Sequence, residues 1–589
     1  MIIQFSNVLH SQVPLAEYQV QSYDQAVTGQ DEEIQVPVLI VGGSLVGLST
    51  ALLLARHGVE SLVVERHSGT AIHPRAGHFN LRTLEILRSA GLEDTVRRKS
   101  REQYPPDGGI SNVESLAGRE IATYFTDLNA GVAEFSPTIR LFINQDALEP
   151  ILRERAESLG ARTRYRTECT SLEQDGDGIT AVLTGAATGT QSRVRARYAV
   201  AADGNRSPVR NRLGIGMRGH GVLSNSITIY FRAERDLAPL LAGRNQGVHY
   251  VTNPVLRGFF RLDRSGNGGF LVVNLVGDTA RPEIVAAYPE APWANVADGI
   301  TKDRAIELLR AAIGVPGMPL VVEDIATWQA VADVADRYSD GRVFLAGDAV
   351  HVVPPNGGFG GNTGVQDAHN LAWKLALVLN GTAGPGLLAT YDAERRPVGE
   401  FTVEQSYARY VTRVAPYLGT ADAQPVVDDL YLELGYRYDS PAIIAEPGDD
   451  RPPHQHPRDC TGQPGSRAPH VFLRRGGTRL STLDLFGGNF VLLTGARGAA
   501  WCDLARDAAR PLGVGLDAYQ VADGEAREPA AGELADADSG FCAAYGISPD
   551  GAVLVRPDGF VAWRAADTAG ATAEGMSGVL SRVLCRANA

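Results

Sequence analysis

Residues 345–375 read "LAGDAVHVVPPNGGFGGNTGVQDAHNLAWKL", and this stretch decides how the rest of the chain is interpreted. An apolar strand ends in Gly347-Asp348, the step Pro354-Pro355 follows, and five glycines lie within 357–364 before a helical pattern begins. Because glycine has no Cβ, such a run lets a large group approach the backbone closely. The stretch therefore predicts a ligand bound against the main chain.

The composition indicates a globular protein of several domains. The chain has 589 residues, of which 44% are hydrophobic and 21% charged, a length that suits three or four domains. Its net charge of -13 repels nucleic acid and anionic membranes, so we expect neither as a partner. Small molecules are the expected partners.

Cysteine usage and the N-terminal residues favour the cytoplasm. The five cysteines are scattered and form no C-x-x-C pair, so neither a disulfide framework nor a zinc cluster is expected. The first 35 residues lack the pattern of a signal peptide. No apolar run reaches the roughly 18 residues that span a bilayer. We therefore expect a soluble cytoplasmic protein.

A βαβ unit begins at Val38. "VLIV" predicts a buried strand, "GGSLVG" a tight turn, "LSTALLLARHG" a helix ending near Gly58, and "SLVVE" a second strand. Further along, "LEPILRERAESLG" predicts a helix and "RYAVAADG" a strand that runs into a turn. Residues 366–415 are predicted to be helical.

Two later regions have a different character. Residues 220–325 contain strand patterns such as "SITIYFRA" and "GFLVVNLV", which predict an inserted sheet that covers a ligand. The Pro-rich residues 439–469 predict a linker. Beyond it, "NFVLLTG", "CDLARDAARPLG", "LDAYQVA" and "GAVLVRPDGFVAWRA" predict a β-α-β unit and a hairpin turned at Asp558-Gly559. With a final helix, this is the order of a small thioredoxin-like domain.

The turn at 42–47 has the context of a dinucleotide fingerprint. It follows a strand and opens a helix, where backbone N–H groups and the helix dipole can hold a pyrophosphate. Gly42 and Gly47 fit the pattern, but Ser44 replaces its middle glycine, so the phosphate must lie farther out or accept the serine hydroxyl. Glu65 ends the second strand and is placed to bind ribose hydroxyls. A plain βαβ turn is the alternative.

Three other chemistries are disfavoured. A G-x-S-x-G nucleophile elbow is absent, because the glycine after Ser44 comes three residues later, which argues against a serine hydrolase. His454, His456 and Cys460 lie in the Pro-rich segment without a partner cluster, so we expect no metal site. Cys502 begins a helix of the C-terminal domain but has no second cysteine, and we expect it to be packed and inert.

Taken together, "GGSLVGLSTALLLARHGV" (42–59), "ADGNRSPVR" (202–210) and the opening stretch resemble the single-component FAD-dependent aromatic hydroxylases, the p-hydroxybenzoate and phenol hydroxylase family. "HPRAGHFNLRTLEILRSAGL" (73–92), "INQDALEPILRERA" (143–156) and "YDAERRPVG" (391–399) are also similar to that family. The resemblance covers about residues 36–410. Within the family, the chain looks most like the polyketide hydroxylases of antibiotic-producing actinomycetes.

The resemblance implies an α/β fold with a Rossmann-like FAD-binding domain at 36–215 and 325–400. A β-sheet substrate domain at 216–324 is inserted in it, and part of 75–140 can join that domain. An N-terminal extension (1–35), a helical connection (401–438), the linker (439–469) and a thioredoxin-like domain without a redox C-x-x-C pair (470–589) complete the chain. A homodimer is compatible with this layout.

The resemblance also implies roles for particular residues. Asp348 should bind the ribityl chain of FAD, and Asp203, Ser207 and Arg210 match a motif linked to both FAD and NADPH. Asp203 could equally cap a turn. The residues expected around FAD are Gly42, Ser44, Gly47, Glu65, Arg66, Arg75, Arg140, Gln145, Asp203, Asp348, Pro355, Gly357, Gly358, Gly360, Gly361 and Asn362. Of these, Pro355, Gly357, Gly358 and Arg75 are expected beside the flavin ring, although a surface turn is the alternative for Arg75.

The implied reaction is a monooxygenation. NADPH, or NADH, would bind transiently and reduce the flavin, which would add O2 at C4a and pass one hydroxyl from the hydroperoxyflavin to a phenolic, polycyclic polyketide ring. The helix expected to start near Asn362 would direct its positive end at the flavin. Baeyer-Villiger or epoxidising chemistry on the same fold remains an alternative, as does a non-catalytic flavin-bearing interaction protein.

The substrate should lie between the flavin and the inserted sheet. A base that deprotonates the phenol is not identifiable from the sequence. Candidates by position and residue type are aromatic residues and a histidine of that sheet, although a buried core position is the alternative for each. They are Tyr230, His249, Tyr250, Phe259 and Trp328.

Overall fold

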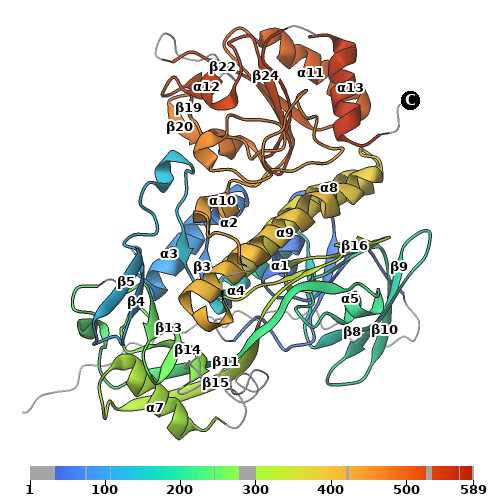
Figure 1. The fold of residues 1–589 in the computed structure, drawn as a ribbon. Coiled ribbons are helices and arrows are strands. Elements are labelled where there is room, and N and C mark those ends of the chain that lie inside the picture. Colours follow the sequence, from blue (N-terminus) through green and yellow to red (C-terminus); the bar gives the residue numbers. More distant parts are fainter. Residues whose placement is uncertain are drawn as a thin grey trace, which may run out of the picture.

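The computed structural model describes residues 33–72, 76–105, 108–244, 246–276, 300–419, 423–524, 534–568 and 571–586. The expected N-terminal extension and Arg75 lie outside these ranges, apart from the last residues before the first strand. Three large sheets form the architecture (Figure 1). The C-terminal sheet lies at one end of the molecule, and two long helices separate it from the other two sheets (Figure 1). The prediction of an α/β fold is confirmed.

The first sheet carries the expected βαβ unit. Its strands are β1 (Ile34–Val41), β2 (Ser61–Val64), β7 (Arg162–Arg164), β8 (Thr167–Gln174), β9 (Ile179–Gly185), β10 (Gln191–Ala201), β16 (Ser339–Asp340) and β17 (Val343–Leu345). The order is β16-β17-β10-β1-β2-β7, and β9 pairs with both β10 and β8. β1 is parallel to β2 and β10, and β10 is parallel to β17. The chain therefore leaves β1, β10 and β17 at the same edge of the sheet.

Helices cover this sheet and explain the apolar run at its centre. Val38, Leu39 and Ile40 have no exposed surface, as expected for a parallel strand covered on both faces. The helices of this part are α1 (Leu45–Arg56), α4 (Gln145–Ser158), α5 (Pro208–Arg212), α8 (Phe359–Leu379) and α9 (Gly386–Arg413). α1 packs against both α4 and α8. α8 begins at Phe359, earlier than the expected start near Asn362.

The second sheet contains the strands expected at 216–324, and it is completed by two strands from earlier in the chain and a short strand from later in it. Its strands are β4 (Ile110–Val113), β5 (Glu120–Phe125), β11 (Met217–Ala233), β12 (Val248–Thr252), β13 (Leu256–Leu262), β14 (Gly268–Val276), β15 (Leu320–Ala335) and β18 (His351–Val352). The order is β18-β15-β11-β14-β13-β12-β4-β5. On one face, α7 (Lys302–Ile313) packs over a core that contains Ile229, Phe260 and Leu271. The other face is turned toward the first sheet.

Short elements connect the two sheets. β3 (His78–Phe79) pairs with β6 (Leu141–Phe142), and α2 (Leu81–Ser89) and α3 (Glu93–Gln103) follow β3. Asn80 caps α2 by accepting a hydrogen bond from the Thr83 N–H at 3.1 Å. These elements hold residues 76–78 beside the start of α8.

The C-terminal part contains the predicted β-α-β unit, hairpin and final helix, and it adds further strands and a short helix. Its strands are β19 (Phe472–Arg475), β20 (Thr478–Ser481), β21 (Phe490–Thr494), β22 (Leu516–Ala522), β23 (Leu534–Asp536), β24 (Ala552–Val555) and β25 (Val561–Ala565), and its helices are α11 (Ala499–Leu512), α12 (Phe541–Tyr545) and α13 (Ala573–Val583). β21 and β22 are parallel, and β24 and β25 form the antiparallel hairpin. Gly559 has φ +77° at the hairpin turn, a conformation that favours glycine.

The segment predicted as a linker is packed against both neighbouring parts. After α10 (Asp429–Glu433), bridges pair Tyr436 with His454 and Arg437 with Ser466. Ser466 has no exposed surface, and the ring of Tyr438 stacks on Phe560 with 4.1 Å between centroids. The segment is therefore an ordered connection between the two parts.

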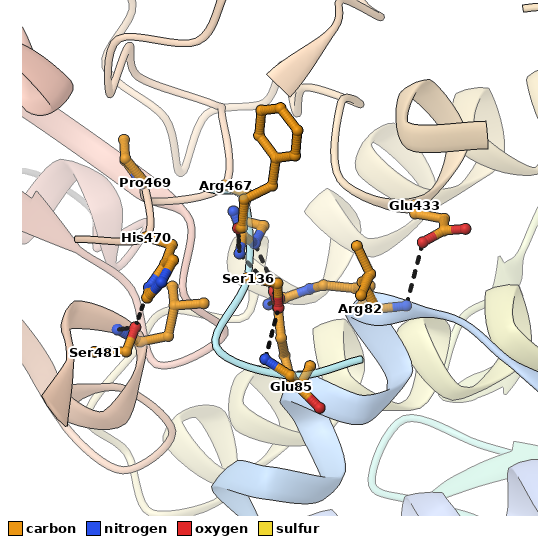
Figure 2. Close-up of polar contacts among 12 residues, drawn as sticks. Arg82, Glu85, Ser136, Glu433, Arg467, Pro469, His470 and Ser481 are labelled. Atoms are coloured by element: carbon orange, nitrogen blue, oxygen red, sulfur yellow. Dashed lines mark hydrogen bonds and ion pairs between the residues drawn. The ribbon is translucent and has the colours of Figure 1, made fainter. Parts of the chain in front are cut away.

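A buried ion-pair cluster joins the C-terminal part to α2. Figure 2 shows Glu85 of α2 between Arg82 and Arg467. Arg467 reaches Glu85 through Nε at 2.9 Å, and Ser136 donates to the same carboxylate at 2.7 Å. Burial raises the pKa of Glu85, but Arg467 and Arg82 outweigh it and hold the pKa below its ordinary value. The C-terminal domain is thus docked through a charged contact that water does not reach.

Candidate functional site

The turn between β1 and α1 has the shape that a phosphate group requires. Gly42 has φ +104°, and a Cβ there would lie 2.2 Å from the Ala202 carbonyl oxygen. A Cβ on Gly47 would lie 1.9 Å from the Gly42 carbonyl oxygen. α1 has no side-chain cap and no acidic residue in its first turn. Its first N–H groups are therefore available to an anion, which fits the pyrophosphate of a dinucleotide.

Ser44 has a role that explains the missing glycine of the fingerprint. Its hydroxyl donates to Glu149 Oε1 at 2.5 Å and accepts from Gln145 Nε2 at 2.9 Å. Gln145 Oε1 in turn accepts from the Ala76 N–H at 3.1 Å. The serine thus joins the turn to α4. Sequence reasoning missed Glu149, whose signal was its spacing of one helical turn from Gln145.

Glu65 lies beside this turn, at the end of β2. Its carboxylate accepts from the Gly43 N–H at 2.8 Å and from the His67 N–H at 2.9 Å. Burial raises the pKa of Glu65, but these hydrogen bonds outweigh it and keep the group ionised. The neighbouring Arg66 is exposed. The assignment of both residues to the nucleotide stays a prediction.

The second and third motifs meet at the same sheet edge. Ser207 caps α5 by accepting from the Arg210 N–H at 2.9 Å, and Asp203 Oδ2 accepts from the Val209 N–H at 3.1 Å. Arg210 Nη1 donates to the Ala349 carbonyl at 2.9 Å, which braces one motif against the other. Asp348 is exposed between buried neighbours. The assignment of Asp348 to the ribityl chain stays a prediction.

A buried triad that sequence reasoning missed supports the Gly347-Asp348 turn. Asp367 of α8 accepts from the Gly347 N–H at 3.0 Å, from His351 Nε2 at 2.8 Å and from Arg395 Nε at 2.8 Å. Burial raises the pKa of Asp367, but Arg395 and His351 outweigh it and lower the pKa. Arg395 also donates to the Thr363 carbonyl at 3.1 Å. The segment "YDAERRPVG" thus holds the turn and the first part of α8 together.

The glycine-rich stretch forms an open turn before α8. Gly357 has φ +102° and Gly358 has φ +69°. A Cβ on Gly358 would lie 3.0 Å from His78 Nδ1, and one on Gly361 would lie 3.0 Å from Leu45 Cδ2. α8 has no side-chain cap and no acidic residue in its first turn. Its N–H groups therefore remain available beside this turn. The assignment of Gly360 and Pro355 to the flavin site stays a prediction.

The Asn362 side chain forms hydrogen bonds with neighbouring elements of the protein. Its Oδ1 accepts from the Asn80 N–H at 3.0 Å and from the Thr83 hydroxyl at 2.7 Å, and its Nδ2 donates to the carbonyls of His78 and Gly358. The amide therefore fastens α8 to β3 and α2. A role for Asn362 in binding the cofactor stays a prediction.

Arg140 also has protein partners. Its Nε donates to Glu433 Oε1 at 2.8 Å, and Nη1 donates to the Leu128 carbonyl. Figure 2 shows Glu433 beside the start of α2, where it accepts from the Leu81 N–H at 3.2 Å. Burial, opposed by Arg140, raises the pKa of Glu433 to about 7. A contact of Arg140 with FAD stays a prediction.

The expected substrate residues divide between the two faces of the second sheet. Tyr250 pairs with Phe259 across β12 and β13, and their rings lie 6.0 Å apart. Side chains alternate along a strand, so both lie opposite the α7 core that contains Val251 and Phe260. Tyr230 and Trp328 share the face of Tyr250. His249 lies on the other face and contacts Ser111 Oγ at 2.9 Å, so the structure does not bring it to the site.

Two residues missed by sequence reasoning connect this face to the glycine turn. Asn356, between Pro355 and Gly357, donates from Nδ2 to the Tyr250 hydroxyl at 3.2 Å. Arg261 of β13 donates to the Gly77 carbonyl at 3.1 Å, and its guanidinium lies 3.6 Å from the centroid of the Tyr104 ring. The sheet face with Phe259 and Tyr250 therefore lies directly against the glycine turn.

Other described residues bear on the chemistries that the sequence disfavours. No cluster of three metal-ligating side chains occurs within the described ranges. Cys502 is buried, and burial raises the pKa of its thiol, so it is poorly suited to nucleophilic chemistry. Among the helices described, none is long and apolar enough to cross a membrane.

Comparison with known proteins adds a family context to this geometry. Residues 35–406 match the model of an FAD binding domain, and residues 461–587 match the model of the C-terminal domain of aromatic-ring hydroxylases. The chain is 55% identical to 4-methyl-5-nitrocatechol 5-monooxygenase of Burkholderia sp over 557 residues, covering 94% of this chain and 98% of the relative. It is 40% identical to tetracenomycin A2 monooxygenase-dioxygenase of Streptomyces glaucescens, covering 94% and 97%.

A solved structure agrees over the whole length of its chain. The crystal structure of a ternary complex of aklavinone-11 hydroxylase with FAD and aklavinone matches with a TM-score of 0.84 and 40% sequence identity. The match covers 94% of this chain and 100% of the solved chain.

Proposed function

The chain belongs to the FAD-dependent aromatic-ring monooxygenases, and from that premise we propose that it hydroxylates a single phenolic ring of the nitrocatechol type. It uses FAD, O2 and a reduced nicotinamide. The observation that carries the proposal is the meeting of the glycine turn at 357–361 with the aromatic sheet face around Tyr250. A flavin ring against the turn would face a substrate ring on the sheet.

The flavin, when bound, supplies the activated oxygen, and the protein's residues supply binding and orientation. The turn at Gly42 and the start of α1 would hold the pyrophosphate, Glu65 the ribose, and Asp348 the ribityl chain. The free N–H groups at the start of α8 would stabilise negative charge on the reduced ring. Tyr250 and Phe259 would hold the substrate ring and exclude water.

The choice of substrate class rests on sequence identity. The Burkholderia relative, named for a nitrocatechol, shares 55% of residues with this chain, whereas the tetracenomycin relative shares 40%. Both alignments cover at least nine-tenths of each chain, so the difference is not one of length. We therefore place a single-ring nitrocatechol ahead of a polycyclic phenol.

Nitrite release distinguishes this reaction from ordinary hydroxylation. Oxygen added at a nitro-bearing ring carbon lets the ring expel nitrite with the bonding electrons. A nitrocatechol, O2 and the reduced nicotinamide then give a hydroxyquinone, nitrite, water and the oxidised nicotinamide. The test is to supply the holoenzyme with 4-methyl-5-nitrocatechol and follow nicotinamide oxidation, nitrite and product mass. Oxidation that the nitrocatechol does not stimulate would contradict the proposal.

A polycyclic phenol is the second candidate, favoured by the similarity to a hydroxylase solved with aklavinone. For such a substrate, the product would gain one oxygen atom and no nitrite would form. Ring expansion or epoxidation would also add one oxygen, and the position of the new oxygen separates these outcomes. Running polycyclic phenols and nitrocatechols side by side therefore assigns the substrate class.

Three finer features complete the proposal. NADPH is the proposed reductant, with NADH as the alternative, and the ratio of kcat/KM for the two decides between them. A homodimer in the cytoplasm is the proposed state, and the mass of the holoenzyme in solution tests the assembly. The net charge of -13 supports a small molecule, rather than nucleic acid or an anionic membrane, as the partner.

A further inference from the structure

Two buried asparagines on the substrate side each use only one end of the amide. Asn356 is 2% exposed, and its Nδ2 donates to Tyr250 while its Oδ1 is buried with no hydrogen-bond partner. Asn112 is 9% exposed, hydrogen bonds to the Tyr124 hydroxyl, and likewise leaves its Oδ1 buried and unpaired. Buried amide groups are rarely left unpaired, because doing so costs free energy. The Oδ1 of each asparagine can therefore accept a hydrogen bond from a ligand.

The two amides flank one aromatic cluster. Asn112 is the register partner of Tyr250 across the parallel strands β4 and β12, so the two side chains lie on the same face. The rings of Tyr124 and Tyr250 meet edge to face, with 5.8 Å between centroids. Asn356 reaches the hydroxyl end of Tyr250 from the glycine turn. Asn112 therefore neighbours Tyr250 at its backbone end, and Asn356 neighbours it at its hydroxyl end.

A cation lies over the same cluster. The guanidinium carbon of Arg413, at the end of α9, is 4.7 Å from the Tyr124 ring centroid and 5.9 Å from that of Tyr250. Arg413 is half-buried and forms no ion pair with any residue in the described ranges. A partly desolvated cation without a carboxylate attracts an anionic oxygen.

We propose that this cluster is the subsite that selects a dihydroxylated ring. One hydroxyl donates to the Oδ1 of Asn356 beside the glycine turn and the other to the Oδ1 of Asn112, while Arg413 supplies positive charge beside the electron-rich ring. A monophenol can satisfy only one of the two amides. The inference rests on the proposed function and deepens it, since it assigns the residues that recognise the two hydroxyls of a catechol ring.

The test is a binding titration of the oxidised holoenzyme, without nicotinamide, using 4-nitrocatechol and 4-nitrophenol. The readout is the dissociation constant of 4-nitrophenol divided by that of 4-nitrocatechol. A general loss of folding or affinity changes both constants alike and leaves this ratio unchanged. We expect wild type to bind 4-nitrocatechol roughly tenfold more tightly. Asn112→Ala and Asn356→Ala should each bring the ratio toward one. The Ser111→Ala variant, on the same strand but the opposite face, should keep it.

A wild-type ratio near one, or a ratio that neither asparagine variant changes, would overturn the inference. If an alanine variant fails to fold, the nearly isosteric Asn112→Leu and Asn356→Leu variants fill the same space without a hydrogen-bond acceptor and should also bring the ratio toward one. An unchanged ratio in both leucine variants would also overturn it. Turnover by wild type reports separately on the proposed function, since a holoenzyme that discriminates the ligands but does not oxidise them retains the subsite and loses the reaction.

Discussion

Arg395 Nε lies 2.8 Å from Asp367 Oδ1, and neither side chain has any exposed surface. The pair joins α9 to α8 beneath the Gly347-Asp348 turn, because Asp367 also accepts from the Gly347 N–H. Residues 345–375 and 391–399, which both resemble the aromatic hydroxylase family, thus form one buried support beneath the turn. Its integrity should govern both folding and cofactor retention.

Replacing Arg395 by methionine should destabilise the protein strongly. Removing one partner of a buried pair leaves an uncompensated charge and costs about 3–5 kcal/mol. The neighbour Arg396 forms half-exposed pairs with Asp392 and Glu400, so Arg396→Ala should cost about 0–1 kcal/mol. Urea unfolding of the two variants measures the difference. Equal midpoints would show that the buried pair does not support the fold.

The Asp348→Ala variant should lose FAD affinity while keeping its stability. The side chain is exposed in the structure, so its removal leaves no cavity and no buried charge. A hydrogen bond to a charged group is typically worth about 1.5–3 kcal/mol, which predicts a loss of roughly ten- to a hundredfold in FAD binding. Flavin fluorescence titration of the apoprotein measures it. Unchanged FAD affinity would refute the ribityl contact.

The Ser44→Gly variant should retain FAD. The serine hydroxyl is engaged with Glu149 and Gln145, so the turn's N–H groups do not depend on it for phosphate binding. The expected change is a loss of about 1 kcal/mol in unfolding free energy, because Glu149 loses a buried donor. Thermal unfolding and the same flavin titration check both halves of the prediction. A large loss of FAD affinity would place the hydroxyl on the phosphate instead.

Acid should destabilise the protein partly through His454. Burial, with its ring stacked on Phe401 at 3.6 Å, lowers the pKa of His454 from 6.5 to about 4. The unfolded chain then binds the proton between these two pH values and the folded chain does not, so stability present above pH 6.5 is lost as pH falls toward 4. The contribution is at most roughly 3 kcal/mol. In the His454→Gln variant the unfolding free energy should fall less steeply over this range, and identical slopes would contradict the assignment.

Short-range sequence patterns were sufficient to predict these elements and turns. The βαβ unit, the Gly42 turn and the C-terminal hairpin at Asp558-Gly559 follow from short-range rules of periodicity and glycine conformation. The sequence pattern predicts too late a start for α8, because glycines normally disfavour a helix. Here Gly360 and Gly361 lie inside its first turn, where close packing against Val353 and Leu45 leaves little room for side chains.

Contacts between segments that lie far apart in the chain could not be predicted from the sequence. Asp367 and Arg395 are 28 positions apart, and no periodicity links them. Alternation predicts that His249 and Tyr250 point to opposite faces of a strand, but not which face meets the ligand. That depends on α7, which covers the His249 side. Asn356 lay within the quoted stretch, yet its importance comes from Tyr250, which only the fold brings to it.

The most direct test of the account is the ratio of nitrite released to nicotinamide oxidised when the holoenzyme turns over 4-methyl-5-nitrocatechol. If the ring lies between the glycine turn and the Tyr250 face, the two amounts should be equal, with the hydroxyquinone as product. Nicotinamide oxidation that yields hydrogen peroxide without nitrite or any oxygenated aromatic product would contradict it.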